Sequence, residues 1–320
     1  MQIRLNKRKF LKSRDIKGWL IMLLPLVLFS FFVWYPMIFN VVLAFSYTDA
    51  NLRIIGFAGF DHFRYLFTYS EFTTALLNTL IYAGFSILIG FLIPIAVALL
   101  LSEVVHFKGF FRSMFYMPSI ISGVAVAILW LGLFTPGELG FLNAIFGTDH
   151  QFLNSSNRIT PIVLIIITMT WRGFGATMLI YLASLQTVDS QQYEAAKIDG
   201  AGPLRRIRSV TLPHIIPLVK VLFVLQLISV FQVFVEPLVM TAWGGPDGAS
   251  MSVLLLAFQY FRRDENSEAA AISVLIAVMI MAFTFFYLWL TRGEEAKIKA
   301  KQRKEDRKQR RITKKLRTIY

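Results

Sequence analysis

Four long stretches of this chain contain no charged residue. They are Gly18–Thr48, Phe72–Ser102, Ser113–Gly137 and Ala269–Thr291. Two further apolar stretches hold only one or two charges, since residues 161–186 include Arg172 and residues 215–241 include Lys220 and Glu236. A helix needs about 20 mostly apolar residues to cross the hydrocarbon core of a bilayer. The sequence therefore predicts six membrane-spanning helices.

The composition agrees with a membrane protein and excludes several kinds of site. The chain is 56% hydrophobic and 16% charged, whereas soluble domains are about 45–50% apolar and about 25% charged. It has no cysteine, which excludes disulfides, thiolate metal sites and cysteine nucleophiles. The four histidines lie far apart without HExxH or paired spacing, so no metal site is expected.

The predicted fold is an all-α polytopic membrane protein whose membrane domain covers residues 18–291. The expected spans are about 18–47, 72–102, 113–135, 161–186, 215–241 and 269–291. The first apolar run follows basic residues, as in a secretory signal, but the apolar core of a signal is only about 7–15 residues long. We therefore interpret it as an uncleaved helix, preceded by a basic arm (residues 1–17). A basic tail (residues 292–320) follows the last span.

The distribution of basic residues predicts the orientation. With both termini on one side, that side holds 27 of the 33 Lys and Arg residues and the other side holds 5, with Arg172 inside a span. Basic residues near span ends favour the cytoplasmic side, so both termini are expected in the cytoplasm. The tail carries 13 of these residues and should attract the anionic inner leaflet. A solvated orientation signal and a contact with a partner protein remain alternatives, and no nucleic acid is expected.

The loop between spans four and five, residues 189–213, has the composition of a soluble helix. Asp189 and Ser190 are of types that begin helices. Pro203 disfavours helical conformation at Gly202. We expect a short amphipathic helix that lies across the cytoplasmic face of the membrane.

One face of that helix carries small side chains. Tyr193, Ala196, Lys197 and Gly200 share it by their i, i+3, i+4, i+7 spacing. Ala196 and Gly200 would let the surface of another protein approach the backbone closely. An ordinary interspan helix without a docking role is the alternative.

Five polar residues in or near the spans are candidates for a substrate pathway. Arg172 lies near the middle of span four and Glu236 near the outer end of span five. A charged side chain at the centre of a membrane helix costs about 2.5–3.5 kcal/mol on insertion scales, so Arg172 should face the protein interior, a partner subunit or a wet cavity. Glu236 could pair with a basic group or line the entry. Asn78, Gln226 and Gln232 are further candidates. For Arg172, a structural anchor is the alternative role.

The order of residues in the loop points to one protein family, which its helical character alone does not. Glu194–Ala196, Asp199–Ala201 and Val210–Pro213 resemble, in order and spacing, the EAA loop of the permease subunits of binding-protein-dependent ABC importers. Val210 stands where isoleucine is usual, and this change leaves the main features of the loop intact.

Other segments resemble the carbohydrate-uptake branch of that family. Phe57–Phe63 is similar to its FVGLDNY segment, Asn78–Leu80 to its NTL segment and Thr241–Pro246 to its TxGGP turn. Ile207 and Asp189 stand where this branch usually has phenylalanine and proline. The likeness covers nearly everything from residue 19 to residue 292.

The resemblance implies a transport subunit rather than an enzyme. Its partners would be a second homologous permease, two ATPase subunits, an extracellular sugar-binding protein, a sugar and membrane lipid, in a prokaryotic cytoplasmic membrane. ATP and Mg²⁺ would bind the ATPase subunits and no cofactor would bind this chain, which contains no GxxxxGK[ST] motif. The residues expected to dock and couple the ATPase are Tyr193, Glu194, Ala195, Ala196, Lys197, Asp199, Gly200, Ala201 and Pro213.

Two other classes of protein compete with this interpretation. A secondary transporter or channel acting alone would need coupling-ion groups in broken helices, usually within repeated halves, and the chain shows no such repeat. An intramembrane enzyme would need a catalytic cluster, and the sequence offers none. The sequence does not identify the sugar, although the branch favours an oligosaccharide.

Overall fold

The computed structural model describes residues 13–49, 51–103, 106–137, 139–155 and 157–291. These residues form two compact units. Unit 1 combines residues up to 68 with residues 257–274, and unit 2 combines residues 69–256 with those from 275 onward. Most of the predicted basic arm and the whole predicted basic tail lie outside the described residues.

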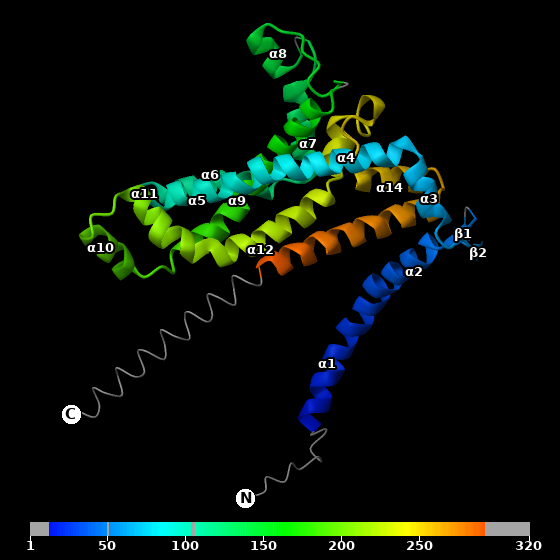
Figure 1. Ribbon diagram of the computed structural model, residues 1–320, viewed down its shortest axis with the longest axis horizontal. Helices are drawn as coiled ribbons and strands as arrows, with labels where there is room; N and C mark the ends of the chain where they lie inside the picture. Colours follow the sequence, from blue (N-terminus) through cyan, green and yellow to red (C-terminus); the bar gives the residue numbers. More distant parts are fainter. Residues whose placement is uncertain (1–12, 50, 104–105, 138, 156, 292–320) are drawn as a thin grey trace, which may run out of the picture. The chain divides into compact units, whose positions relative to one another are not determined.

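Nearly all regular structure is helical, as predicted (Figure 1). The α-helices are α1 Ser13–Phe29, α2 Tyr35–Ala44, α3 Asp61–Thr68, α4 Ser70–Phe85, α5 Leu92–Glu103, α6 Lys108–Ile120, α7 Gly123–Phe134, α8 Phe141–Phe146, α9 Ile159–Leu185, α10 Ser190–Ile198, α11 Pro203–Arg206, α12 Leu212–Phe231, α13 Val235–Met240 and α14 Val253–Arg262. A last helix covers Asn266–Thr291. Segments of π-helix join α1 to α2 (Ser30–Trp34), α4 to α5 (Ser86–Phe91) and α11 to α12 (Ile207–Thr211), and Pro246–Gly248 form a 3₁₀ turn.

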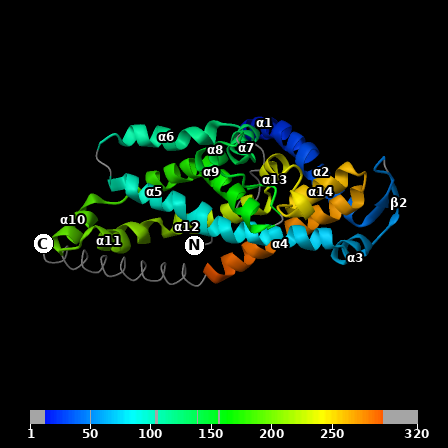
Figure 2. The same cartoon turned by 90° about the horizontal axis from the view of Figure 1, so that it is seen from above.

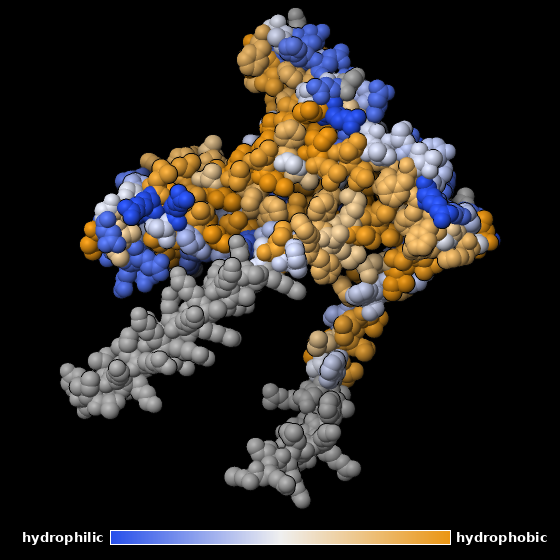
Figure 3. Space-filling view, viewed as in Figure 1, coloured by the Kyte–Doolittle hydropathy of each residue, from blue (hydrophilic) through white to orange (hydrophobic). Residues whose placement is uncertain are grey.

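Five helical stretches are long and apolar enough to cross a membrane. They are Gly18–Ala44, Ser70–Glu103, Ile159–Leu185, Pro203–Met240 and Asn266–Thr291. A bent pair, α6 and α7, brings the number to six if it counts as one span. Apolar side chains dominate the surface of the long helices of unit 2 (Figure 3). The described chain is therefore that of a multi-pass membrane protein.

The third predicted span, residues 113–135, is not one straight helix. α6 and α7 meet at an angle of 97°. Ile121 and Ser122 are extended between them, and the Ser122 side chain accepts a hydrogen bond from the backbone N–H of Ala125 at 3.3 Å. A serine that satisfies a free N–H group begins a new helix, which a search for uncharged runs does not detect.

The fifth predicted span, residues 215–241, also differs. Its helix begins at Pro203 and is interrupted between Phe231 and Val235. Pro237 has no N–H group to offer the carbonyl of Val233, four residues earlier. The Ser252 hydroxyl donates a 2.6 Å hydrogen bond to that carbonyl instead, so a tertiary contact stabilises the break.

Unit 1 departs from the predicted all-α class by a short hairpin. Strands β1 (Ser46–Thr48) and β2 (Ile54–Phe57) pair antiparallel. Asp49 closes the turn, because its carboxylate accepts hydrogen bonds from the backbone N–H groups of Asn51 at 2.9 Å and Arg53 at 2.8 Å. Isoleucine, tyrosine and threonine favour strands, and such Asp contacts favour turns.

A buried histidine connects three elements of unit 1. The Nδ1 atom of His62, in α3, lies 3.1 Å from a carboxylate oxygen of Glu268, in the last helix. Its Nε2 atom lies 3.1 Å from the carbonyl oxygen of Ser46, in β1, which also accepts a 2.7 Å hydrogen bond from the Ser267 hydroxyl. His62 is therefore a structural residue that holds α3 against β1 and the last helix.

Unit 2 is built around α9, which packs against α4, α5, α6 and α12. α5, α9 and α12 run side by side in both ribbon views (Figures 1 and 2). Gly175 lets α9 approach α6 very closely, because a Cβ atom there would overlap the carbonyl group of Phe115. The core includes buried Tyr82, Ile162, Ile165 and Ile166.

Candidate functional site

The loop of residues 189–213, here named the α10 loop, begins as the sequence predicts. A carboxylate oxygen of Asp189 accepts a 3.0 Å hydrogen bond from the backbone N–H of Gln191, which caps α10 at Ser190. Gly202 is extended and Pro203 opens α11. The loop lies at one end of unit 2, where Figure 3 shows polar side chains gathered beside the apolar helices.

The end of α10 depends on Gly200. Its φ is +73°, a conformation that costs residues with a side chain roughly 1–2 kcal/mol. The Gly200 N–H donates to the Lys197 carbonyl at 3.0 Å, and the Ala201 N–H donates to the Ala196 carbonyl at 2.9 Å. These two bonds form a Schellman motif. A Cβ atom on Gly200 would meet no other atom of the described chain within 4 Å. Within this chain, glycine is therefore favoured by the backbone conformation and not by a lack of space for a side chain.

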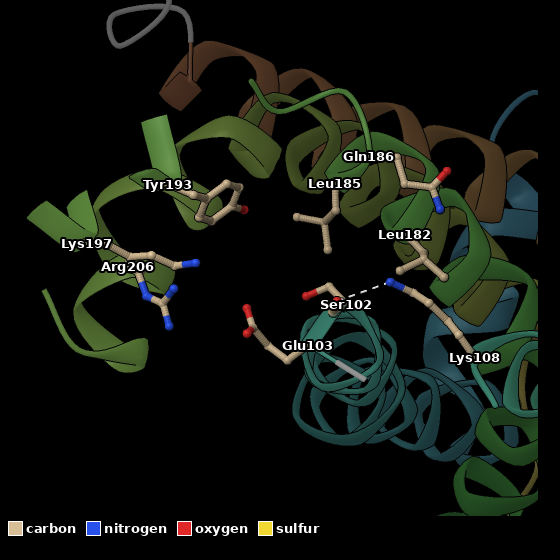
Figure 4. Close-up of a pocket in the computed structure, with 9 residues that line it drawn as sticks. All are labelled: Ser102, Glu103, Lys108, Leu182, Leu185, Gln186, Tyr193, Lys197 and Arg206. Carbon is tan, nitrogen blue, oxygen red and sulfur yellow. Dashed lines mark hydrogen bonds between the residues drawn. The ribbon is translucent and has the colours of Figure 1, made fainter. Parts of the chain in front are cut away.

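Two side chains of the predicted docking face, Tyr193 and Lys197, point toward other helices of unit 2. The Tyr193 hydroxyl lies 3.0 Å from the hydroxyl of Thr211, which is 2% exposed. Tyr193 and Lys197 line a pocket of about 260 Å³ against the rest of unit 2 (Figure 4). Glu194 and Ala195 are exposed. Glu194 and Ala195 do not belong to the face that helical spacing defines. The side chains accessible to a partner protein are therefore only in part those of the predicted face.

That pocket, here named the loop pocket, is rich in polar side chains. It is lined by Ser102, Glu103, Lys108, Leu182, Leu185, Gln186, Tyr193, Lys197 and Arg206. The Lys108 ammonium donates a 3.1 Å hydrogen bond to the Ser102 carbonyl, drawn in Figure 4. The sequence does not predict this pocket, because its lining residues come from five separate helices.

The α10 loop also exposes two large apolar side chains that are not among the predicted docking residues. Ile198 and Leu204 are each 86% exposed and flank the turn at Gly200. Exposed apolar side chains grouped on a polar loop indicate a contact surface. Pro213 is exposed at the second residue of α12, within the helical stretch that begins at Pro203.

A second cavity lies among the spans and contains two of the predicted pathway residues, Arg172 and Gln226. This span cavity has a volume of about 320 Å³. The Gln226 side-chain amide donates a 2.6 Å hydrogen bond to the Ser86 hydroxyl. A Cβ atom on Gly90 would lie 2.8 Å from the Gln226 amide nitrogen and 3.3 Å from the Thr170 hydroxyl oxygen. Glycine thus leaves room for a group of neutral hydrogen-bonding side chains.

Arg172 lies at the edge of this cavity and faces Glu236. The closest distance between their charged groups, Nη2 to Oε1, is 3.8 Å. Glu236 is buried at 5% exposure, whereas 37% of the Arg172 side chain is exposed. The pair connects α9 to α13. The Ser119 hydroxyl donates a 2.8 Å hydrogen bond to the Arg172 carbonyl, which fixes α6 to α9 near the bend.

The other two predicted pathway residues lie elsewhere. The buried Asn78 amide donates hydrogen bonds to the carbonyls of Gly248, at 2.7 Å, and Met251, at 3.1 Å, so it holds the loop that follows α13. Gln232 is exposed in the break between α12 and α13. Neither lines the span cavity. Among the described residues no group of three His, Asp or Glu side chains could hold a metal ion.

Comparison with known proteins places the chain among transport proteins. Residues 90–299 match the family described as the binding-protein-dependent transport system inner membrane component. A relative from Bacillus subtilis strain 168, the probable ABC transporter permease YesP, is 32% identical over 293 residues, 88% of this chain and 93% of YesP. The lactose transport system permease LacF of Rhizobium radiobacter is 31% identical over 290 residues, 87% of this chain and 95% of LacF.

A solved structure agrees with this match. The crystal structure of a bacterial alginate ABC transporter, in complex with a periplasmic protein bound to an alginate pentasaccharide, contains a chain with the same fold. The TM-score is 0.76 at 27% sequence identity, over 88% of this chain and 95% of that chain. The resemblance inferred from the α10 loop is confirmed, and the chain belongs to the family of binding-protein-dependent transport system inner membrane components.

Proposed function

We propose that the chain is the permease subunit of an ATP-driven carbohydrate importer in the cytoplasmic membrane of a prokaryote. It would form one half of the pore, and a second homologous permease would form the other half. The family match carries this proposal. The sugar class is supported by the lactose permease and by the alginate transporter, and an oligosaccharide is the favoured substrate.

The α10 loop is the proposed docking site for a separate ATPase subunit. Glu194 and Ala195 are exposed, and Ile198 and Leu204 offer apolar contact area. The opposite face of α10 contacts its own chain through Tyr193. A helix with one face on the permease body and the other open to a partner can transmit a movement of that partner to α12. ATP and Mg²⁺ would bind the ATPase.

The span cavity is the proposed part of the sugar pathway in this chain. Sugars offer many hydroxyl groups, and Ser86, Thr170 and Gln226 supply donors and acceptors at that wall. A polar site of this kind discriminates strongly against ligands that leave its groups unpaired. Arg172 adds a charge, which Glu236 offsets in part. Asn78 and Gln232 are not included in this pathway.

The proposed orientation has both termini in the cytoplasm, on the side of the α10 loop. It rests on the excess of Lys and Arg in the segments assigned to that side. The external side would receive the sugar from a binding protein. The alginate transporter, which was crystallised with such a protein, supports this arrangement.

Co-purification tests the proposal. The tagged chain would be extracted from its native membrane, beside a variant with Glu194→Ala and Gly200→Asp. We expect a second permease and an ATPase with the natural chain, and loss of the ATPase from the variant. An intact chain that purifies alone would favour the single-chain transporter. An ATPase retained by the variant would contradict docking through the α10 loop.

A further inference from the structure

The loop pocket gathers basic side chains from separate elements. Lys108 lies at the start of α6, Lys197 in α10 and Arg206 in α11, and Glu103 at the end of α5 is the one acidic residue among the lining residues. With these four groups ionised, the pocket carries a net charge of +2. Figure 4 shows the charged ends of Lys197, Arg206 and Glu103 directed into a common space.

These charges are poorly satisfied within the described part of the chain. None of Lys108, Lys197 and Arg206 forms an ion pair there. The Nε atom of Arg206 is buried without a hydrogen-bond partner among the described residues. Hydrogen bonds between ionised groups of opposite charge are the strong ones, so a ligand that accepts hydrogen bonds and carries negative charge would be stabilised by these three unpaired cations.

The surroundings of the pocket place it where a membrane surface would lie. Leu100, in the last turn of α5, is 71% exposed, and Phe107 and Phe110 beside Lys108 are 79% and 64% exposed. In a membrane protein, lipid covers exposed apolar side chains of this kind. The apolar surface of α5 and α6 therefore ends where the basic side chains begin, which is the level of lipid headgroups.

We propose that the loop pocket binds the phosphate group of an anionic membrane lipid, held by Lys108, Lys197 and Arg206. Basic pockets between spans bind anionic headgroups in this way. Such a lipid would join the ends of α5 and α6 to the α10 loop, with its acyl chains on the exposed apolar side chains nearby. Glu103 opposes this binding, because its carboxylate faces the same space. The inference requires only that the chain spans a membrane and is independent of the proposed transport function.

Native mass spectrometry can measure this binding directly. The full-length chain, with the subunits that accompany it, would be stripped of lipid and titrated with phosphatidylglycerol or with neutral phosphatidylcholine. We expect saturable retention of phosphatidylglycerol alone. Neutralising Lys197 and Arg206 together (K197Q, R206Q) should weaken it by about fivefold or more per charge removed. Neither side chain forms an ion pair among the described residues, so the fold should tolerate the change.

A matched variant controls for general surface charge. Arg205 and Arg208 are exposed on the same loop and do not line the pocket, so R205Q with R208Q removes the same charge and should retain the lipid. Equal losses in the two double variants would overturn the proposal. Glu103→Gln should tighten binding, and unchanged binding would place the headgroup elsewhere. Displacement of the lipid by inorganic phosphate at equal concentration would indicate a site for free phosphate and refute a lipid site.

Discussion

The hydroxyl oxygen of Tyr193 in α10 lies 3.0 Å from that of Thr211, the last residue before α12. Thr211 is buried, and α12 continues from it into the spans. This hydrogen bond is a direct polar link between the helix proposed to receive the ATPase and a membrane span of unit 2.

Tyr193→Phe should weaken this link while it leaves the exposed face of α10 intact. A single hydrogen bond contributes about 0.5–1.5 kcal/mol, so we expect the ATPase to remain bound and less sugar to be imported per ATP hydrolysed. The measurement is the ratio of uptake to hydrolysis in reconstituted vesicles. Tyr116→Phe, at an exposed tyrosine in α6, is the control. An unchanged ratio in the Tyr193 variant would show that the link does not transmit movement.

Gly200→Ala should destabilise the α10 loop, because Gly200 has a φ of +73°. We expect a loss of roughly 1–2 kcal/mol, measured by hydrogen exchange of the α10 amides. Gly202→Ala is a close control, since Gly202 has a φ of −64° and a Cβ atom there would also meet no atom within 4 Å. Equal exchange in the two variants would show that the positive φ has no energetic consequence.

Gly200→Asp and Gly200→Asn separate conformation from docking. Both residues tolerate a positive φ better than alanine does. If docking of the ATPase requires that position 200 has no side chain, both variants should lose transport although normal amounts of the protein reach the membrane. Normal uptake by the asparagine variant would limit the role of Gly200 to ending the helix.

Local signals predicted the α10 loop well and the third and fifth spans less well. Asp189 and Pro203 act on their immediate neighbours, so their effect on helix ends could be read from the sequence. The bend at Ser122 interrupts an uncharged run, and a search for charges cannot detect it. The break before Val235 depends on a hydrogen bond from Ser252, which only the folded chain reveals.

The residues of the candidate site could also be predicted only in part from the sequence. Their polarity within spans predicts a pathway role for Arg172 and Gln226, and both line the span cavity. The same reasoning predicts a pathway role for Asn78, which instead binds the backbone of a distant loop. A buried amide satisfies its hydrogen bonds wherever the fold brings partners, and polarity alone does not separate the two roles.

Asn78→Ala should destabilise the protein. It removes two hydrogen bonds and leaves two carbonyls without these donors, at a cost of about 1–3 kcal/mol for each buried polar group that stays unpaired. Thermal unfolding in detergent would show a lower midpoint. Asn154→Ala, at an exposed asparagine, should have little effect. A full loss of uptake with an unchanged midpoint would contradict the structural role and support a place in the sugar pathway.

Arg172 and Glu236 should be energetically coupled across their 3.8 Å separation. Arg172→Gln leaves a buried carboxylate without its cation, and Glu236→Gln leaves the cation without its carboxylate. Contacting residues typically couple by about 0.5–3 kcal/mol, so the double variant should be more stable than the sum of the single effects predicts. A double-mutant cycle of thermal unfolding measures this coupling, and additive effects would show that the pair does not stabilise α9 against α13.

Gly90→Val should obstruct the span cavity. A Cβ atom at Gly90 would lie 2.8 Å from the Gln226 amide nitrogen and 3.2 Å from the Ser86 hydroxyl oxygen. The added side chain must displace this polar group, and overpacking of this kind costs about 1–3 kcal/mol. If the cavity is part of the sugar pathway, uptake should fall while the ATPase still binds and the protein reaches the membrane in normal amounts.

Gly84→Val is the matched control for this experiment. Gly84 lies in the same membrane-spanning stretch, and a Cβ atom there would meet no atom within 4 Å. Valine at this position should therefore leave uptake close to that of the natural chain. Equal uptake by the two variants would move the sugar pathway away from this cavity, to another surface of this chain or to the second permease. A selective loss in the Gly90 variant would assign the wall formed by Ser86, Thr170 and Gln226 to the route of the sugar.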